Sequence, residues 1–328
     1  MKIPKTGGIV YSDVKRKYFP TETQYLTEKG AKDDAKTIAK YFNKLGIKPK
    51  LYPGDSLLAN RLRRDKPNFV LNIVGSVKGN EYLASTIPAV LELLDIPYTG
   101  AGILGESLSY NKFLVKKLLQ QNGIPVPNYQ LFNSSTDQIN SSLRFPLISK
   151  LDQIHGSVEI TQDAVSENEK HLRARIKYLI KTYGQQVLVE EFIVGREIVA
   201  FLLEGFNKKV YLSERIFHKK NDKYTFATFE TQWLDKEDKL SHYEKFKDQL
   251  LTEYVKKAFQ ITRMADYGKF DIRLDDSGRY FFLDCNTNPY FGPIEMGADI
   301  SYVLKLYNVN FLQILKRIIL NTMKEAGY

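Results

Sequence analysis

Hydrophobic and polar positions follow two different periods along this 328-residue chain. In the first hundred residues, short apolar runs at 8–12 (GIVYS) and 67–75 (PNFVLNIVG) are separated by a helix-like stretch at 35–46. A second helical pattern, STIPAVLELLDI, covers 85–96. Strands that alternate with helices predict βαβ units and a parallel sheet, in which ligands bind where the strands end. The pattern therefore predicts an N-terminal α/β lobe.

The rest of the chain mixes short strands with amphipathic helices. Its predicted elements before residue 210 are a helix at 111–121, a strand at 145–150, a hairpin turn at Gly156 within 151–161, a long helix at 166–184 and two strands around Gly195 within 185–205. After VYLSERIF (210–217), the pattern predicts a charged loop to about residue 242, a helix at 245–265, a hairpin at 267–286 that turns at DDSG, and a helical stretch at 301–326.

Composition excludes several classes of protein. A single cysteine, Cys285, excludes a disulfide framework and a cysteine-built zinc site, and HExxH, GxSxG and GxxxxGK[ST] motifs are absent. The net charge of +10 invites a nucleic-acid interpretation, but the lysines and arginines are spread along the whole chain. No apolar run approaches the roughly 18 residues of a membrane helix, and the N-terminus has no signal-like apolar stretch. These features predict a cytoplasmic protein that binds neither membrane nor nucleic acid.

The closing hairpin carries a candidate metal site. Lys269, Asp271 and Arg273 share one face of its first strand, because successive side chains of a strand point to opposite sides. Asp284 and Asn286 share a face of the second strand, and the turn brings Asp284 near Asp271. Two carboxylates and an amide suit Mg²⁺, which completes its shell with water and phosphate oxygens. The alternative is a hairpin whose polar residues face solvent.

Charged residues at the ends of predicted elements form a second group of candidates. Lys112 begins a helix and Lys150 ends a strand, which are places from which lysines reach phosphates; each is otherwise a surface lysine. Glu190 ends a buried run and Glu197 follows a glycine turn, so these acids could accept from an adenine amino group or ribose hydroxyls. A pair of surface acids is equally consistent. The turn IHGSVE offers backbone N–H groups that can cover phosphates.

Taken in order, these stretches resemble the ATP-grasp superfamily, and most closely its D-alanine–D-alanine ligase-like branch. The matching stretches are NIVGSVKGNEYLASTIPAVLELLDIPYTGAG, NKFLVKKLLQQNGIPVP, FPLISK with GSV, VLVEEFIVGREI and FDIRLDDSGRYFFLDCNTNP. The resemblance implies an α/β fold, of the α+β ATP-grasp type, in which two lobes clasp ATP. It implies an N-terminal Rossmann-like substrate lobe (1–106), a central lobe with the phosphate loop (107–186) and a C-terminal lobe with the metal site (187–328).

The resemblance also implies an activity and roles for individual residues. In the family, ATP phosphorylates a carboxylate to an acyl phosphate, an amine attacks, and ADP and phosphate leave. By that likeness Lys112 and Lys150 bind phosphates, and Gly156 belongs to the phosphate-covering loop. Glu190 and the backbone at Phe192 and Ile193 would hold adenine, and Glu197 would hold ribose. The metal ion, Mg²⁺ or Mn²⁺, would be carried by Asp271, Asp284 and Asn286, and catalysis would involve Ser157, Lys269 and Arg273.

The sequence departs from the family inside the expected catalytic centre. The metal carboxylate of the last strand is usually glutamate and is here Asp284, one methylene shorter. The family arginine that steadies the tetrahedral intermediate is replaced by Lys269, and Arg273, two residues past Asp271, is a hypothetical substitute. The phosphate loop keeps one serine of two, Ser157.

Further departures fall in the expected substrate pocket. The Lys-Tyr pair of the family's mobile loop is replaced by Gln232 and Trp233, and the serine stretch that grips the substrate carboxylate is replaced by YFGPIEMGA, with Tyr290 and Glu295. The glutamate-containing serine-rich loop of the family is absent from YSDVKRKYFPTETQ. A carboxylate at Glu295 would repel the carboxylate of an amino-acid substrate.

These observations predict an ATP-dependent, ADP-forming ligase that joins small-molecule carboxylates and amines of an amino-acid-like or specialised-metabolite class. A genuine D-alanine–D-alanine ligase and a nucleotide-binding scaffold without chemistry are the alternatives. The resemblance adds a homodimer as a candidate assembly.

Overall fold

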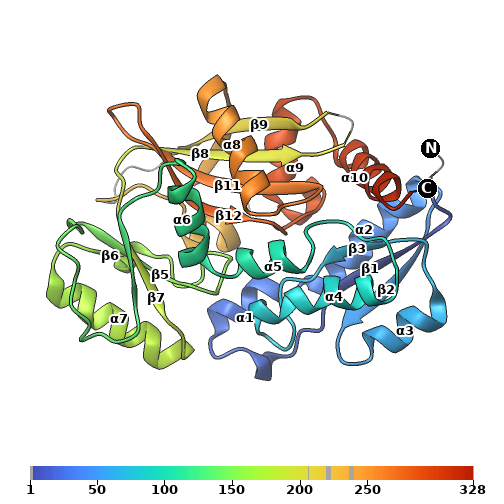
Figure 1. The fold of residues 1–328 in the computed structure, drawn as a ribbon, viewed down its shortest axis with the longest axis horizontal. Helices are drawn as coiled ribbons and strands as arrows, with labels where there is room; N and C mark the ends of the chain where they lie inside the picture. The colour runs from blue at the N-terminus through green and yellow to red at the C-terminus, as the bar shows by residue number, and fades with distance from the viewer. Residues whose placement is uncertain (1–2, 206, 219–222, 236–239, 328) are drawn as a thin grey trace.

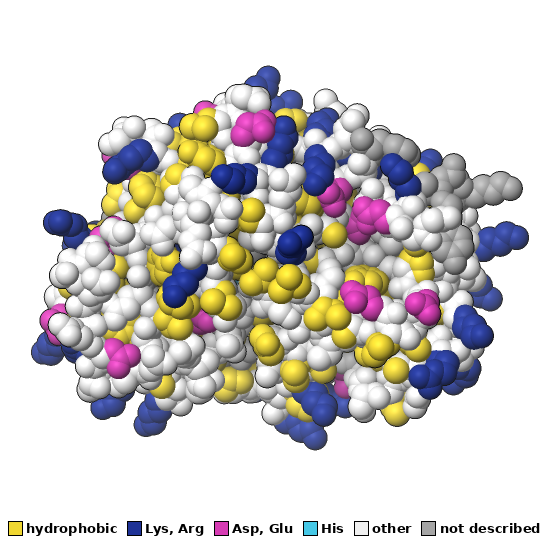
Figure 2. Space-filling view, in the orientation of Figure 1, with side chains coloured by type: hydrophobic (Ala, Val, Ile, Leu, Met, Phe, Trp, Pro, Cys, Tyr) yellow, Lys and Arg dark blue, Asp and Glu magenta, His cyan; other side chains and the backbone are white. Residues whose placement is uncertain are grey.

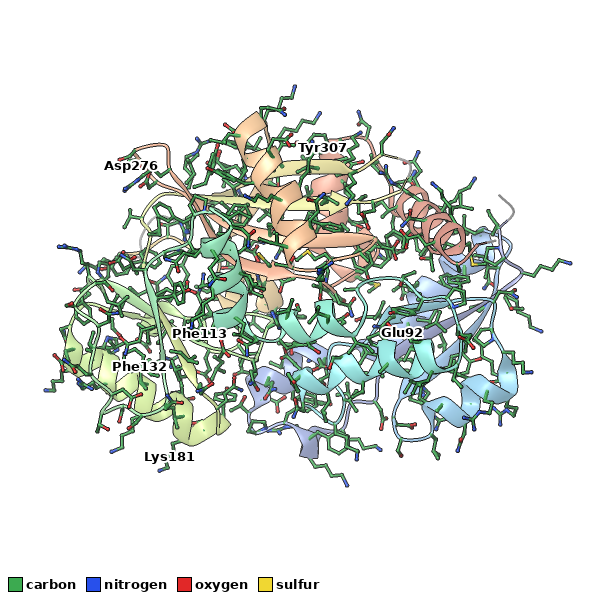
Figure 3. All side chains as sticks on the ribbon, viewed as in Figure 1. Glu92, Phe113, Phe132, Lys181, Asp276 and Tyr307 are labelled. Atoms are coloured by element: carbon green, nitrogen blue, oxygen red, sulfur yellow. The ribbon has the colours of Figure 1, made fainter. Side chains whose placement is uncertain are left out.

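The chain folds into three lobes, each built on its own β-sheet (Figure 1). The computed structural model describes residues 3–205, 207–218, 223–235 and 240–327. Labelled side chains mark the lobes in Figure 3: Glu92 in the N-terminal lobe, Phe132 and Lys181 in the central lobe, and Asp276 and Tyr307 in the C-terminal lobe. The predicted fold class, a parallel-sheet lobe followed by two α+β lobes, is confirmed.

The N-terminal lobe is a parallel sheet in the order β2-β1-β3 with helices around it. Helix α2 packs closely on β1, because a Cβ at Gly7 would come within 2.7 Å of the rings of Phe42 and Phe69. The elements are β1 (Thr6–Ser12), α1 (Glu22–Glu28), α2 (Ala31–Lys44), β2 (Lys48–Gly54), α3 (Leu58–Asp65), β3 (Val70–Ile73), α4 (Thr86–Leu93) and α5 (Ile103–Ser109).

The central lobe is an antiparallel sheet in the order β4-β7-β5-β6, covered by helix α7. Leu172, Ile176 and Leu179 recur on one face of α7 and pack on the sheet. The helix ends at Gly184, whose φ of 64° is the left-handed conformation that glycine accepts without strain. The elements are α6 (Lys112–Gln121), β4 (Tyr129–Phe132), β5 (Leu147–Leu151), β6 (Val165–Ser166), α7 (Glu169–Tyr183) and β7 (Val187–Glu191).

The C-terminal lobe is an antiparallel sheet in the order β10-β9-β8-β11-β12. Helices α8 and α6 pack on one face of this sheet, and α9 and α10 pack on the other. Helix α10 also contacts β1 and α2, which joins this lobe to the N-terminal one. The elements are β8 (Arg196–Leu203), β9 (Lys209–Phe217), β10 (Ser241–Phe246), α8 (Gln249–Ile261), β11 (Tyr267–Leu274), β12 (Tyr280–Asn286), α9 (Asp299–Leu306) and α10 (Phe311–Glu325).

Three sequence predictions about elements were wrong. Residues 241–246 form strand β10 rather than a loop and a helix start; the strand is at a sheet edge, so its polar side chains can face solvent. The stretch 301–326 is two helices, because Asn310 caps a new helix with its side chain and with Gln313. Within 151–161, Leu151 ends β5 and the residues after it form turns without a hairpin, while β5 pairs with β6 and β7.

Packing divides the chain differently from the expected lobe boundaries. Strand β7 pairs with β4 and β5, so the central sheet extends past residue 187. Helix α6 buries Val115 and Leu119 in the core of the C-terminal lobe. Helix α6 therefore packs against the C-terminal lobe, although in sequence it belongs to the region assigned to the central lobe.

Lysines and arginines form no single patch on the face shown in Figure 2; they are scattered, mostly towards the outline of the molecule. Hydrophobic side chains run across the middle of this face. Within the described residues, no helix combines the length and the apolar character needed to cross a bilayer.

Candidate active site

A cavity of about 1020 Å³ lies where the three lobes meet. Its walls include Glu28 from α1, Gly156 from the loop after β5, Asp271 and Asp284 from the closing hairpin, and the chain that leaves β12 at 288–297. Four segments that are far apart in the sequence therefore face one space.

The predicted pairing in the closing hairpin is present. Asp271 lies opposite Asp284 in the register of β11 and β12, and Lys269 lies opposite Asn286. The Asn286 amide donates to Asp271 Oδ2 over 3.4 Å, while Cys285 points into the core, as expected from the alternation. Asp271, Asp284 and Asn286 all line the cavity.

This trio fits a hard divalent cation only in part. Among the described residues, no group of three or more His, Cys, Asp or Glu side chains is arranged to hold a metal. The trio offers two carboxylates and one amide, which suits Mg²⁺ if water and substrate phosphates supply the remaining ligands. Asp284 is prepared for this role: burial opposes its ionisation, but Lys112, His155, Lys150 and Lys116 lower its pKa to about 2.

Lys112 stands beside the hairpin at the start of α6. Asn111 caps the helix by accepting from the Leu114 N–H, which fixes the first turn. The Lys112 ammonium donates to the carbonyl of Ile154 over 2.8 Å and lies 4.0 Å from Asp284 Oδ2. The side chain thus links the loop after β5, the predicted phosphate loop, to the candidate metal site.

Glu190 holds two lysines in a buried cluster. Its carboxylate lies 2.9 Å from Lys116 Nζ and 2.9 Å from Lys150 Nζ, and the glutamate itself is fully buried. Burial would raise the pKa of Glu190, but the two lysines lower it. Burial lowers the pKa of Lys116, which also donates to the carbonyls of Phe282 and Leu283.

Lys116 was missed by the sequence analysis, although a signal for it exists. The buried residues of α6 are Lys112, Val115, Lys116 and Leu119, at the spacing of a core-facing stripe. Two lysines on the apolar face of an amphipathic helix indicate buried partners.

A third group surrounds the connection between β7 and β8. Glu197 Oε2 accepts from the Ala227 N–H over 3.0 Å and lies 3.5 Å from Arg273 Nη2. Arg273 donates to the carbonyls of Gly195 and Thr225 and lies over the ring of Phe192. Arg273 is therefore committed to this connection and is not among the residues that line the cavity, whereas Lys269 is.

Phe192 and Ile193 form the connection itself. The Phe192 N–H donates to the carbonyl of Pro146, and its ring packs against Tyr224 and Phe226. Ile193 follows in the same connection, next to the exposed Val194. The predicted adenine residues thus lie together, beside Glu190.

The phosphate loop touches the segment that carries Gln232 and Trp233. Ser157 Oγ donates to Gln232 Oε1 over 2.8 Å, and Trp233 Nε1 donates to the carbonyl of Gly156 over 2.8 Å. Gly156 and Ser157 both have positive φ, 67° and 53°. Trp233 belongs to a π-helical turn, Glu230–Leu234. The two segments close one side of the cavity together.

The chain leaving β12 forms another part of the cavity wall. The Tyr290 hydroxyl donates to Asp34 Oδ2 over 3.0 Å, and the Tyr41 hydroxyl donates to Glu295 Oε1 over 2.8 Å. Trp233 and Tyr290 approach with ring centroids 5.9 Å apart. Both predicted substrate residues of this segment, Tyr290 and Glu295, are therefore held against α2.

Several further cavity residues were not identified from the sequence, among them Glu28, Asp34, Arg215 and Asp299. Glu28 Oε2 is buried without a hydrogen-bond partner among the described residues. Burial and the charge of Glu81 raise the pKa of Glu28 to about 7. Helix α1 thus supplies an acid to the cavity from a position four residues past the stretch YSDVKRKYFPTETQ, in which no glutamate-containing loop was recognised.

The structure brings most of the candidates together. Ten of them line the cavity: Gly156, Ser157, Gln232, Trp233, Lys269, Asp271, Asp284, Asn286, Tyr290 and Glu295. The others lie at the start of α6, on β5, β7, β8 and β11, and in the connection between β7 and β8: Lys112, Lys150, Glu190, Glu197, Arg273, Phe192 and Ile193.

Two antiparallel lobes that present paired lysines, a positive-φ loop and opposed carboxylates are the architecture of an ATP-grasp ligase. The family model for the D-ala D-ala ligase C-terminus matches residues 118–319. The chain belongs to the D-alanine–D-alanine ligase family. It is thus of the class of ATP-dependent ligases that form peptide bonds.

Individual relatives agree with this assignment. A D-alanine–D-alanine ligase from Pseudomonas entomophila is 31% identical over 240 residues, covering 72% of this chain and 71% of that protein. An uncharacterised protein of Sinorhizobium fredii is 29% identical over 275 residues, with 78% of each chain covered. The D-alanine–D-alanine ligase of Bacillus anthracis, solved with ATP, has the same fold at a TM-score of 0.70, 17% identity and 98% coverage of both chains.

Proposed function

We propose that the protein is an ADP-forming carboxylate–amine ligase that activates its acyl substrate as an acyl phosphate. Its substrates are amino-acid-like molecules or specialised metabolites rather than two D-alanines. The observation that carries the proposal is the opposition of Asp271 and Asp284 on the wall of a cavity that the phosphate loop also lines. Carboxylates, a cationic helix start and a flexible loop are what phosphoryl transfer needs.

Each group of residues has a place in this reaction. Asp271, Asp284 and Asn286 would hold Mg²⁺, with Mn²⁺ as an alternative, which when bound would offset phosphate charge. Lys112 and Lys150 would neutralise phosphate oxygens from the other side. The contact of Ser157 with Gln232 would exclude water while the acyl phosphate exists.

Lys269 is our choice for the cation that stabilises the tetrahedral intermediate. Its ammonium lies 3.2 Å from Asp271 and lines the cavity, whereas the guanidinium of Arg273 is bound to two backbone carbonyls away from it. In the second half-reaction the amine nitrogen forms a bond to the acyl carbon. The C–O bond to phosphate breaks, orthophosphate leaves, and the attacking amine gives up one proton.

Hydroxylamine trapping tests the first half-reaction without knowledge of the amine. The purified full-length protein with ATP and Mg²⁺ is expected to convert a carboxylic acid from a mixed pool into its hydroxamate, with equal ADP. Asp271→Asn is expected to lose about 100-fold in rate, the scale of removing one electrostatic contact in an active site. Asp276→Asn, an exposed acid in the turn of the same hairpin, is the matched control.

A genuine D-alanine–D-alanine ligase is the second candidate, and the relatives named above favour it. ADP formation that depends on D-alanine alone would establish it. ATP binding without hydroxamate or ADP would instead identify a nucleotide-binding scaffold and overturn the proposal. A cytoplasmic location and a homodimer remain predictions, which cell fractionation and sedimentation velocity check.

A further inference from the structure

The cavity is acidic although the chain as a whole is basic. Among its lining side chains, eight are Asp or Glu and three are Lys or Arg, in a chain with a net charge of +10. Asp271 and Asp284 are assigned to the candidate metal site. The remaining acids still outnumber the cations, so the field inside the cavity favours a positively charged ligand.

The two buried cations of the cavity already have acidic partners. Asp299, at the start of α9, places Oδ2 3.1 Å from Lys269 Nζ and Oδ1 3.3 Å from Arg215 Nη2. Burial opposes the ionisation of Asp299, but Lys269 and Arg215 lower its pKa to about 2, so it is ionised at neutral pH. A substrate carboxylate at these cations would have to compete with Asp299.

Three other acids that line the cavity have no cationic partner in the part of the chain that the structure describes. Among the described residues, no Lys, Arg or His nitrogen lies within 4.0 Å of Asp34, Glu295 or Glu28. Tyrosine hydroxyls hold one oxygen of Asp34 and one of Glu295, which fixes these carboxylates without neutralising them. The buried Oε2 of Glu28 has no hydrogen-bond donor in the described chain.

Aromatic rings lie beside these acids. Tyr290, which donates to Asp34, faces Trp233 with ring centroids 5.9 Å apart, and both line the cavity. Rings next to fixed carboxylates form the kind of pocket that binds alkylammonium groups.

We propose that the amine substrate of this ligase is a di- or polyamine, with a second cationic group and no carboxylate beside the reacting nitrogen. Asp34 and Glu295 bind the distal ammonium of this amine. Asp299 occupies the place beside Lys269 and Arg215 that the carboxylate of an amino-acid acceptor would take. This inference rests on the proposed function and names the acceptor class for the same site. Asp299 is a specificity determinant, since it removes the binding site for a carboxylate.

Binding of the amine alone tests the proposal. We would titrate putrescine, propylamine and D-alanine into the ATP- and Mg²⁺-loaded full-length protein at pH 8 and follow the heat. Putrescine is expected to bind at least about tenfold more tightly than propylamine, the scale of one additional charge-assisted contact. D-alanine binding as tightly as putrescine, or putrescine binding no better than propylamine, overturns the proposal.

Matched variants separate the site from the general charge of the protein. Asp34→Asn is expected to weaken putrescine about tenfold, and Glu295→Gln about threefold because Glu295 is more exposed and better screened. Glu253→Gln, which removes an exposed acid on α8, is expected to bind putrescine as the parent does. If both cavity variants match Glu253→Gln, the assignment of these two acids is wrong.

A gain of binding tests the role of Asp299. Asp299→Asn removes the carboxylate that Lys269 and Arg215 share, although Lys269 keeps Asp271 and Arg215 keeps Glu197 at 3.7 Å. D-alanine is therefore expected to bind at least about tenfold more tightly than to the parent. An unchanged affinity in a variant whose thermal unfolding midpoint is retained contradicts the role.

The hydroxylamine assay keeps this inference distinct from the proposed function. Hydroxylamine replaces any amine acceptor, so hydroxamate formation reports acyl activation whatever the acceptor is. If hydroxamate forms but the titration shows no tighter binding of putrescine than of propylamine, only the proposed acceptor class is refuted. Absence of hydroxamate from the full acid pool refutes the proposed ligase.

Discussion

At the scale of single residues, the important feature is that two neighbouring lysines of α6, Lys116 and Lys117, differ in burial although the sequence analysis did not distinguish them. Lys116 is fully buried against Glu190, while its neighbour Lys117 is exposed. A buried ion pair adds little net stability, but removing one partner leaves an uncompensated charge in the interior.

Lys116→Met is therefore expected to lower the free energy of unfolding by about 3 kcal/mol, because Glu190 keeps only one of its two cations. Urea denaturation measures the change. Lys117→Met on the same helix is the control, with an expected change within about 0.5 kcal/mol. The double variant Lys116→Met with Glu190→Gln should recover part of the loss, and strictly additive effects would contradict the pairing.

At the scale of elements, the loop around Gly156, the predicted phosphate loop, and the turn Glu230–Leu234 contact each other. The loop around Gly156 has backbone at positive φ, and its contacts to the turn include the hydrogen bonds of Trp233 and Gln232. Neither segment belongs to a sheet, and besides these side-chain contacts the Phe229 N–H donates to the carbonyl of Ile160.

Trp233→Phe keeps an aromatic ring but removes the indole N–H that reaches the Gly156 carbonyl. Hydrogen exchange of residues 155–159 is expected to accelerate about tenfold, the scale of one lost hydrogen bond. Exchange in α10 serves as the internal reference and should not change. Identical exchange of the loop in parent and variant would mean that the contact does not hold it.

At the scale of the whole molecule, buried carboxyl groups join the lobes. Glu106 of α5 is fully buried and accepts from the Thr287 hydroxyl, just past β12. Burial raises the pKa of Glu106 from 4.5 to about 8, and the hydrogen bond from Thr287 opposes this rise. The unfolded chain therefore releases this proton at a lower pH than the folded one.

Because folding raises this pKa, the contribution of Glu106 to stability falls as the pH rises from about 4.5 to about 8. Glu106→Gln is expected to reduce the decline of the free energy of unfolding with pH by at most about 1.4 kcal/mol per pH unit. Urea denaturation at pH 5.5 and pH 8.5 measures the difference. Glu92→Gln, an exposed acid on α4, should keep the slope of the parent, and an equal slope in both variants would contradict the assignment.

The sequence predicted most of the long helices and the paired strands, but fewer of the edges. Helix α7 and the closing hairpin have strong periodicity and clear end signals, so both were found. Strand β10 was missed because an edge strand needs no apolar alternation, and the break between α9 and α10 was missed because apolar residues continue on both sides of it.

The sequence by itself determined that Lys269 and Asp271 share a face of β11 and that Asp284 and Asn286 share a face of β12. A bulge between Asp271 and Ile272 then sets Asp271 opposite Asp284, because the register at the turn, where Leu274 lies opposite Tyr280, would otherwise pair Asp271 with Leu283. Only the tertiary structure placed Glu28 and Asp34 in the same cavity, bound Lys116 to Glu190, and set Asp299 against Lys269 and Arg215. These partners come from different elements and are mostly far apart in the chain. Their proximity is fixed by how helices and sheets pack, which no local period encodes.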